Sequence, residues 1–366
     1  MTSLFKMLKK KKEIFLALTT TFLALLLGLI LIEGYYWKSG YTSLVCEVCR
    51  FHPQLGWDNI PGKTVSNGKV TYTTNSKGMR STEVDSSKGH ILLVGDSVTF
   101  GLGVNNDETV YHYLEKEEKI SSLGYQVLNL GVTGYGIGQY YLNLKRHIDN
   151  LNPKFIVPIL YTTNDRDDTR KDARYGRISK PLFFYQNGNL KNLNPKISRF
   201  SCINLYTRLR FTKYLIPLLF DNCKSRVLEQ GKASPTIAKL IEEIRILGIQ
   251  RNIPTLIVLS PALTTVEAVA CKQPRSSDSC ADFDTDLEAF YKYFQEMMEF
   301  YKFPYLDFLQ HLVDYGAEGE IRSLYGNNGK DIHHYSPQGN YILAQAIAER
   351  FATDFDMNDP EPFHVN

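Results

Sequence analysis

The stretch HILLVGDSVTFG, residues 90–101, places a short apolar run directly before a glycine, an aspartate and a serine. Further apolar runs lie at Gln126–Leu130, Phe155–Tyr161, Leu256–Leu259 and Pro304–Phe308. Runs this short, and apolar on both faces, are typical of buried parallel strands. Pro158 argues against a central place for the third run, because it lacks a backbone N–H and is expected at a sheet edge or a bulge.

Helical patterns lie between and after these runs. Ser234-Pro235 predicts the start of a helix and Gly248 its end. A second helix is expected from Asp284 to about Tyr301, and a third from Ser336-Pro337 to about Phe351. Strands that alternate with helices predict an α/β domain whose parallel sheet is covered by helices on both faces.

Polar residues follow the ends of the first three strands. They are Gly95-Asp96-Ser97, Gly131-Val132-Thr133-Gly134 and Thr162-Thr163-Asn164-Asp165, and Asp331-Ile332-His333-His334 comes before the last helix. In open α/β sheets, ligand sites form beyond the carboxyl ends of the strands. A hydroxyl, a flexible backbone, an amide and an Asp/His pair are therefore expected to converge on one rim.

These four blocks, in this order, resemble the SGNH (GDSL-type) hydrolase superfamily, which is named for a Ser, a Gly, an Asn and a His. The resemblance covers roughly residues 89–353, and Asn75–Arg80 is similar to a lead-in of exported members. It implies a three-layer, flavodoxin-like α/β fold and a serine esterase that needs no metal or organic cofactor.

The resemblance also implies a role for each block. Ser97 would be the nucleophile, which needs a base because a free hydroxyl reacts poorly. His334 would take and return the proton, and Asp331 would hold the imidazole tautomer. The backbone N–H groups of Ser97 and Gly134 and the side chain of Asn164 would bind the oxyanion.

Alternatives stay open for two of these roles. Gly131 or Gly136 competes with Gly134 for the oxyanion position. His333 competes with His334 as the base, because an Asp-x-His arrangement also occurs in relatives.

Three further residues near the blocks need an interpretation. Asp96 and Asp165 look like carboxylate partners of the serine, but the resemblance makes both structural, bonded to turn amides. Thr162 stands where the family usually has glycine, so the approach of the backbone at this point is expected to differ.

The first forty residues predict a membrane anchor. Five lysines precede the apolar run Ile14–Ile32, whose length at about 1.5 Å per residue approaches the roughly 30 Å hydrocarbon core. The aromatic residues Tyr35–Trp37 follow, as at a membrane interface. The lysines should stay cytoplasmic, so the catalytic domain would be periplasmic or extracellular. A cleaved signal peptide is the alternative, although no small-x-small cleavage site follows the run.

The expected organisation is a basic tail (1–13), a transmembrane anchor (14–33), a juxtamembrane extension (34–88), a hydrolase domain (89–355) and a C-terminal tail (356–366). The 366 residues are 43% hydrophobic, which excludes a disordered chain. The net charge of the whole chain is +3, and residues 1–13 contribute +4. The remaining residues therefore have a net charge of −1, which argues against a nucleic-acid partner.

Six cysteines suit an oxidising compartment. The pairs expected to form disulfides are Cys46 with Cys49, Cys202 with Cys223, and Cys271 with Cys280. Cys46 and Cys49 lack the histidine of a haem attachment motif and the second pair of a zinc site.

Residues 166–233 form a basic insertion, with 15 Lys/Arg against 5 Asp/Glu. It is interpreted either as a solvated loop or as a lid or patch that faces anionic lipid or glycan. Ile203–Phe220, which contains Arg208, Arg210 and Lys213, suits a membrane surface.

The sequence thus predicts a membrane-anchored esterase that cleaves O-acyl esters of a lipid or an envelope glycan. An O-acyltransferase acting on an envelope polysaccharide would share the acyl-serine step. A catalytically silent binding module would share the cleft, but the presence of Ser97, Asn164, Asp331 and His334 weighs against it.

Overall fold

The central sheet of the molecule has five parallel strands in the order β13-β12-β7-β5-β6. The computed structural model describes residues 2–38, 48–66, 68–174, 178–197, 225–271, 285–316 and 320–354. The sheet strands are β5 (His90–Gly95), β6 (Gln126–Asn129), β7 (Pro153–Tyr161), β12 (Ile257–Ser260) and β13 (Tyr305–Asp307). Each coincides with one of the five predicted apolar runs, so that part of the prediction is confirmed.

Numbered along the chain from β5, the sheet order is 2-1-3-4-5, which is the flavodoxin-like order. The direction of winding reverses between β5 and β7, and in such sheets the ligand crevice opens at this reversal, beyond the carboxyl ends of the strands. The predicted α/β class is therefore confirmed, and the topology singles out the loops after β5 and β7.

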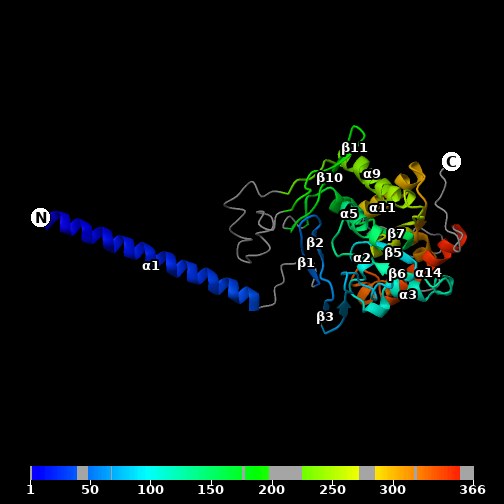
Figure 1. Cartoon of the computed structure of the whole chain (residues 1–366), viewed down its shortest axis with the longest axis horizontal. Helices are drawn as coiled ribbons and strands as arrows, with labels where there is room; N and C mark the ends of the chain where they lie inside the picture. Colours follow the sequence, from blue (N-terminus) through cyan, green and yellow to red (C-terminus); the bar gives the residue numbers. More distant parts are fainter. Residues whose placement is uncertain are drawn as a thin grey trace.

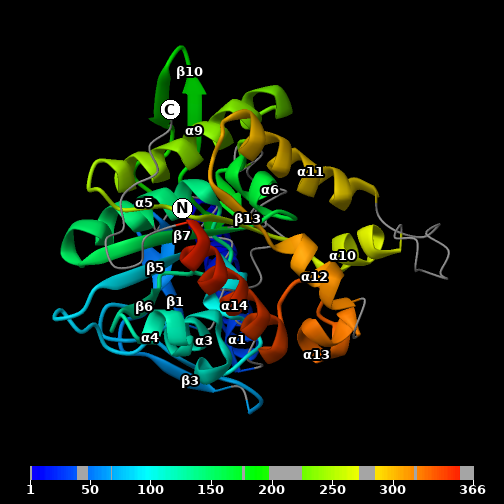
Figure 2. The same ribbon diagram turned by 90° about the vertical axis from the view of Figure 1, so that its right-hand side faces the viewer.

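Helices cover both faces of the sheet (Figure 2). On one face lie α5 (Ile137–His147), α9 (Gln230–Ile249) and α11 (Thr285–Phe300); on the other lie α3 (Val110–Lys116), α12 (Phe308–Gly316) and α14 (Pro337–Asp354). The short helices are α2 (Ser97–Phe100), α4 (Glu118–Ser121), α6 (Asp165–Thr169), α10 (Leu263–Ala270) and α13 (Gly326–Gly329). Every residue of β5, β6 and β12 is buried, which explains why these strands read as continuous apolar runs.

Pro158 lies in the central strand β7, so the expectation of an edge or a bulge was wrong. Its Cα pairs with Val94 of β5. On the other side, a single bridge joins Ile156 to Thr255, and the regular pairing with β12 resumes only at Ile159. The missing N–H of Pro158 falls in this gap, so the sheet accommodates the proline by interrupting one ladder.

One helix start also differs from the prediction. Helix α9 begins at Gln230, with Glu229 as its N-cap, and it contains Pro235. The N-cap predicted at Ser234 is therefore wrong. A proline this close to a helix start deprives only the carbonyl four residues earlier of its donor, so the helix can begin upstream of it. The predicted starts of α11 and α14 are confirmed to within one residue.

Residues 48–66 and 68–88 pack onto the sheet domain. They form two hairpins, β1 (Cys49–His52) with β2 (Gly56–Asn59) and β3 (Thr64–Ser66) with β4 (Thr71–Thr73). Trp57 Nε1 donates to Thr133 O at 2.9 Å, and Asn59 Nδ2 donates to Gly131 O at 3.1 Å. This segment therefore holds the loop that follows β6.

The N-terminal helix α1 (Thr2–Lys38) is one continuous helix (Figure 1). Within it, Lys9–Ile32 is long and apolar enough to cross a membrane, judged by length and composition. The predicted membrane segment is thus helical.

Small strands lie within the insertion. They are β8 (Ala173–Arg174) with β9 (Ile178–Ser179), and β10 (Phe183–Gln186) with β11 (Asn189–Asn192). The segment Ile203–Phe220 lies outside the described residues.

The cysteines of the described residues are Cys49 and Cys271, and both are disulfide-bonded. The other four cysteines lie outside the described residues, so the three expected pairings remain predictions.

Candidate active site

Ser97, His334 and Asp331 form a continuous chain of hydrogen bonds. Ser97 is the first residue of α2 and is separated from the end of β5 only by Asp96, and the other two precede α14. His334 Nε2 lies 2.9 Å from Ser97 Oγ, and His334 Nδ1 lies 2.8 Å from Asp331 Oδ2. The structure therefore brings together the three side chains predicted as nucleophile, base and orienting acid.

The protonation state of Asp331 fixes the direction of these bonds. Burial acts to raise the pKa of Asp331, but hydrogen bonds from the His334 ring and from the backbone N–H groups of His333 and His334 outweigh it, so the pKa lies below 3.8. An ionised carboxylate can only accept, so His334 Nδ1 carries the proton. His334 Nε2 is then free to accept the hydroxyl proton of Ser97.

The turn between β5 and α2 is built around Asp96. Its Oδ1 accepts a hydrogen bond from Val98 N at 2.9 Å and caps the short helix. A side chain at Gly95 would collide with Thr99 and with the carbonyl of Ile159. The turn therefore needs glycine at position 95 and a hydrogen-bond acceptor at position 96, which is the local reason for the Gly-Asp pair that precedes Ser97.

Asn164 lies beside the same turn. Its Nδ2 donates to Asp96 Oδ2 at 3.2 Å. Burial raises the pKa of Asp96, while bonds from Val98 N and Asn164 partly offset that rise. The amide nitrogen carries two hydrogens, so one remains available to a ligand beside Ser97.

Thr162, the departure from the usual glycine, is tied to the neighbouring strand. Its backbone N–H and its Oγ1 both donate to Ser260 O, at 3.1 and 3.2 Å. The loop after β7 is thus fixed to the end of β12, and a small residue is not required there.

The three candidate glycines after β6 differ in their surroundings. A side chain at Gly131 would come within 2.5 Å of Phe100 N, and one at Gly136 within 3.0 Å of the Asp168 backbone. Both therefore have a packing reason to be glycine. Gly134 has φ +79°, and within the described residues its N–H has no hydrogen-bond partner. An unused N–H suits an oxyanion donor, and Gly134 stays the predicted one.

Asp165 is a structural residue in this geometry. Its Oδ1 accepts from Tyr140 Oη at 2.7 Å and its Oδ2 from Tyr161 N at 2.8 Å. Burial raises the pKa of Asp165 well above its usual value. The carboxyl group thus braces the loop that carries Asn164 and does not face the serine.

His333, the alternative base, bonds elsewhere. Its Nδ1 lies 2.8 Å from Tyr161 Oη, and its backbone N–H donates to Asp331 Oδ1 at 3.1 Å. The hydrogen bond to Ser97 is made by its neighbour. Sequence reasoning missed Tyr161, which reads only as the apolar end of a strand.

Arg80, the last residue of the lead-in, is also part of the site's support. Its side chain is fully buried and donates to the carbonyls of Phe100, Gly101 and Val104 and to Asn106 Oδ1. Burial lowers its pKa to about 10. A fork of five donors is well matched to several carbonyls, so Arg80 anchors the loop directly after α2.

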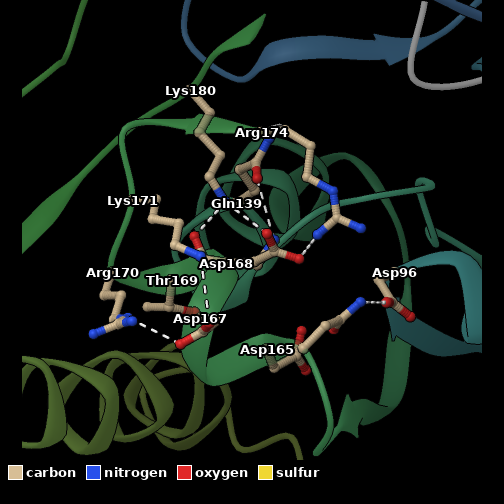
Figure 3. Close-up of polar contacts among 12 residues, drawn as sticks. Asp96, Gln139, Asp165, Asp167, Asp168, Thr169, Arg170, Lys171, Arg174 and Lys180 are labelled. Carbon is tan, nitrogen blue, oxygen red and sulfur yellow. Dashed lines mark hydrogen bonds and ion pairs between the residues drawn. The ribbon is translucent and has the colours of Figure 1, made fainter. Parts of the chain in front are cut away.

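The root of the basic insertion is internally paired (Figure 3). Asp167 bonds Arg170 and Lys171, and Asp168 pairs with Arg174 and Lys180. Burial lowers the pKa of Lys180 well below its usual value, and its ammonium also donates to the carbonyl of Asp168. These four cationic side chains thus pair with carboxylates of the same segment. Arg208, Arg210 and Lys213 lie outside the described residues.

Metal-ligating side chains do not gather in the part of the chain that the structure describes, where no cluster of three or more His, Cys, Asp or Glu could hold an ion. The expectation of no cofactor remains a prediction.

Comparison with known proteins finds no matching family model and no curated protein of similar sequence. Solved structures are similar at low identity. An alpha/beta hydrolase enzyme from the metagenome of Lake Arreo has 11% identity and a TM-score of 0.42, covering 72% of this chain and 95% of its own. A lipase/acylhydrolase from Enterococcus faecalis has 14% identity and a TM-score of 0.40, covering 72% of this chain and 95% of its own. Because the TM-scores are below 0.5, these likenesses leave the reaction of this chain open.

Proposed function

We propose that the chain is a serine ester hydrolase that works through an acyl-serine intermediate. The observation that carries this proposal is the hydrogen-bonded series Ser97–His334–Asp331. A hydroxyl, an imidazole acceptor and an ionised carboxylate in this order are the parts needed to activate an alcohol as a nucleophile.

The first half-reaction would begin at Ser97. His334 Nε2 takes the hydroxyl proton as Oγ attacks the ester carbon, and Asp331 stabilises the resulting imidazolium. The carbonyl oxygen becomes an oxyanion, for which Asn164 Nδ2 and the N–H groups of Ser97 and Gly134 are the proposed donors. Each such donor typically contributes about 3–4 kcal/mol to lowering the barrier.

The first half-reaction ends when the imidazolium returns its proton to the leaving alcohol, which departs as the acyl-serine forms. The second half-reaction repeats these roles with water as the nucleophile. Water then enters, gives its proton to His334 and attacks the acyl carbon, and Ser97 recovers its proton when the acid is released. Atoms balance as ester plus water giving acid plus alcohol.

The location is part of the same proposal. Helix α1, with its lysine-rich start and apolar middle, would anchor the chain with its N-terminus in the cytoplasm and the esterase domain outside the membrane. Acyl esters of a lipid or of an envelope glycan would then be within reach.

The experiment that tests the function uses the purified full chain in detergent. A fluorophosphonate probe should label wild-type protein but not the Ser97→Ala variant, and p-nitrophenyl esters of increasing acyl length should be hydrolysed only by the wild type. Labelling that persists in Ser97→Ala, or wild type inert to every ester and to the probe, would reject the proposal.

A further inference from the structure

His333, the exposed neighbour of the proposed base, is held in an unusually defined position. Its Nδ1 lies 2.8 Å from Tyr161 Oη, and the two rings meet edge to face, 6.1 Å apart at 89°. Its backbone N–H is bonded to Asp331. Holding an exposed histidine ring in one orientation costs side-chain entropy. The ring contact with Tyr161 and the backbone bond to Asp331 therefore point to a functional role for this side chain.

Tyr161 determines which nitrogen of His333 carries the proton. The phenol is 2% exposed, and burial raises its pKa well above 10, so it stays protonated. A buried O–H without an acceptor costs about 1–3 kcal/mol. Thr163 Oγ1, the other polar side-chain atom near the phenol, makes no hydrogen bond to a described residue, so the phenol donates to His333 Nδ1. Burial and the adjacent His334 lower the pKa of His333 below 6.5, so its ring is neutral at pH 7. A neutral ring that accepts at Nδ1 must carry its proton on Nε2.

The place of the His333 ring relative to the reaction follows from His334. The centroids of the His333 and His334 rings are 6.4 Å apart. In the proposed mechanism His334 Nε2 passes its proton to the leaving alcohol, so the alcohol oxygen lies at that nitrogen. A polyhydroxy alcohol held there extends several ångströms beyond this oxygen, so another of its hydroxyls can reach the exposed ring of His333.

We infer that His333 is a specificity-determining residue whose Nε2–H donates a hydrogen bond to a second hydroxyl of the alcohol part of the substrate. The site therefore favours esters of polyhydroxy alcohols, such as sugars, over esters of simple alcohols or phenols. This inference rests on the proposed esterase function and narrows it to one class of alcohol. Hydrogen-bonding sites discriminate in this way because an analogue without the hydroxyl leaves the donor unpaired.

The test compares two acetate esters, a monoacetate of methyl glucopyranoside and p-nitrophenyl acetate, on the full chain in detergent. Both give the same acetyl-serine, so the ratio of their kcat/KM values reports the contact with the alcohol. His333→Phe keeps a ring but removes the donor, and it should lower the sugar-to-phenol ratio about tenfold, the worth of one hydrogen bond. His333→Gln places an amide N–H near Nε2 and should recover most of the ratio.

Two further variants separate a positioning effect from a general one. Tyr161→Phe removes the group that fixes the tautomer and should lower the same ratio by a smaller factor. His112→Phe, on α3, replaces a partly exposed histidine away from the site and should leave the ratio unchanged. Should His333→Phe fail to fold, the Tyr161→Phe ratio decides.

Each outcome has a distinct meaning. A ratio that is equal in wild type and His333→Phe, or a wild type that cleaves p-nitrophenyl acetate but no sugar acetate, overturns the inference and leaves the esterase proposal standing. Wild type that cleaves neither ester and is not labelled at Ser97 by a fluorophosphonate overturns the esterase proposal itself.

Discussion

His334 Nε2 lies 2.9 Å from Ser97 Oγ, although 237 positions separate the two residues. The contact exists because the loop after β5 and the loop before α14 both reach the rim where the winding of the sheet reverses. Asn164, in the loop after β7, lies on the same rim and donates a hydrogen bond to Asp96, the residue preceding Ser97. Residues from β5, β7 and the last loop therefore meet only when the whole sheet is formed.

The two histidines should differ sharply in their effect on hydrolysis. His334→Ala removes the acceptor of the Ser97 proton, so kcat for p-nitrophenyl acetate should fall by about 10⁴-fold or more. His333→Ala leaves that bond intact, so its kcat for the same ester should fall far less. Near-normal activity in His334→Ala together with an inactive His333→Ala would show that the base is misassigned. Circular dichroism of both variants controls for folding.

Asp331→Asn should inactivate the enzyme, because it favours the wrong tautomer of the His334 ring. The backbone N–H groups of His333 and His334 both donate to Asp331 Oδ1, so the oxygen of an asparagine would keep that place. Its NH₂ would then face His334 Nδ1 and drive the ring proton to Nε2, where Ser97 needs an acceptor. We expect kcat to fall by about 10⁴-fold with little change in melting temperature. Asp314→Asn, on the exposed side of α12, is the matched control.

The sequence predicted the five strands and the grouping of the four blocks because both depend on local order. Each apolar run is short, and each polar block follows a strand end, so a parallel sheet must bring them together. It could not place Pro158, since the tolerance of a proline depends on which neighbouring ladder is interrupted. The partnership of Tyr161 with His333 was also out of reach, because it joins residues 172 positions apart.

Arg80 should be essential to the loop that follows α2. Arg80→Met would leave the carbonyls of Phe100, Gly101 and Val104 buried without their donor, each costing about 1–3 kcal/mol. The free energy of unfolding should therefore fall by several kcal/mol, and any folded protein should lose activity. Arg251→Met, which breaks an ion pair with the largely exposed Asp149, should cost less than about 1 kcal/mol. Urea titration of both variants makes the comparison.

The proposed anchor predicts a defined topology. The chain should stay in the membrane fraction after carbonate washing, and a C-terminal tag should be cleaved by protease added outside the cytoplasmic membrane. An N-terminal tag should stay protected until the membrane is opened. A C-terminal tag that resists protease in the same preparation would reverse the proposed orientation, and a mature N-terminus beyond residue 34 would show a cleaved signal instead.

His147, at the end of α5, should make the fold sensitive to acid. Its Nε2 lies 2.9 Å from Arg146 Nη2, and burial, followed by the charge of Arg146, lowers its pKa from 6.5 to about 4. Between these two values the unfolded chain binds a proton that the folded chain does not, so the stability that this group contributes is complete above pH 6.5 and is lost as the pH falls toward 4. A shift of this size corresponds to about 3 kcal/mol.

His147→Gln tests this dependence, because glutamine can accept from Arg146 but does not titrate. Wild type should lose about 3 kcal/mol more unfolding free energy than the variant between pH 7 and pH 4. Urea unfolding, followed by the fluorescence of the buried Trp57, measures both proteins. The variant should keep a smaller acid dependence, because burial also lowers the pKa values of His52 and His90. Parallel pH profiles for wild type and variant would mean that folding does not lower the pKa of His147 and that its contact with Arg146 is not the one described.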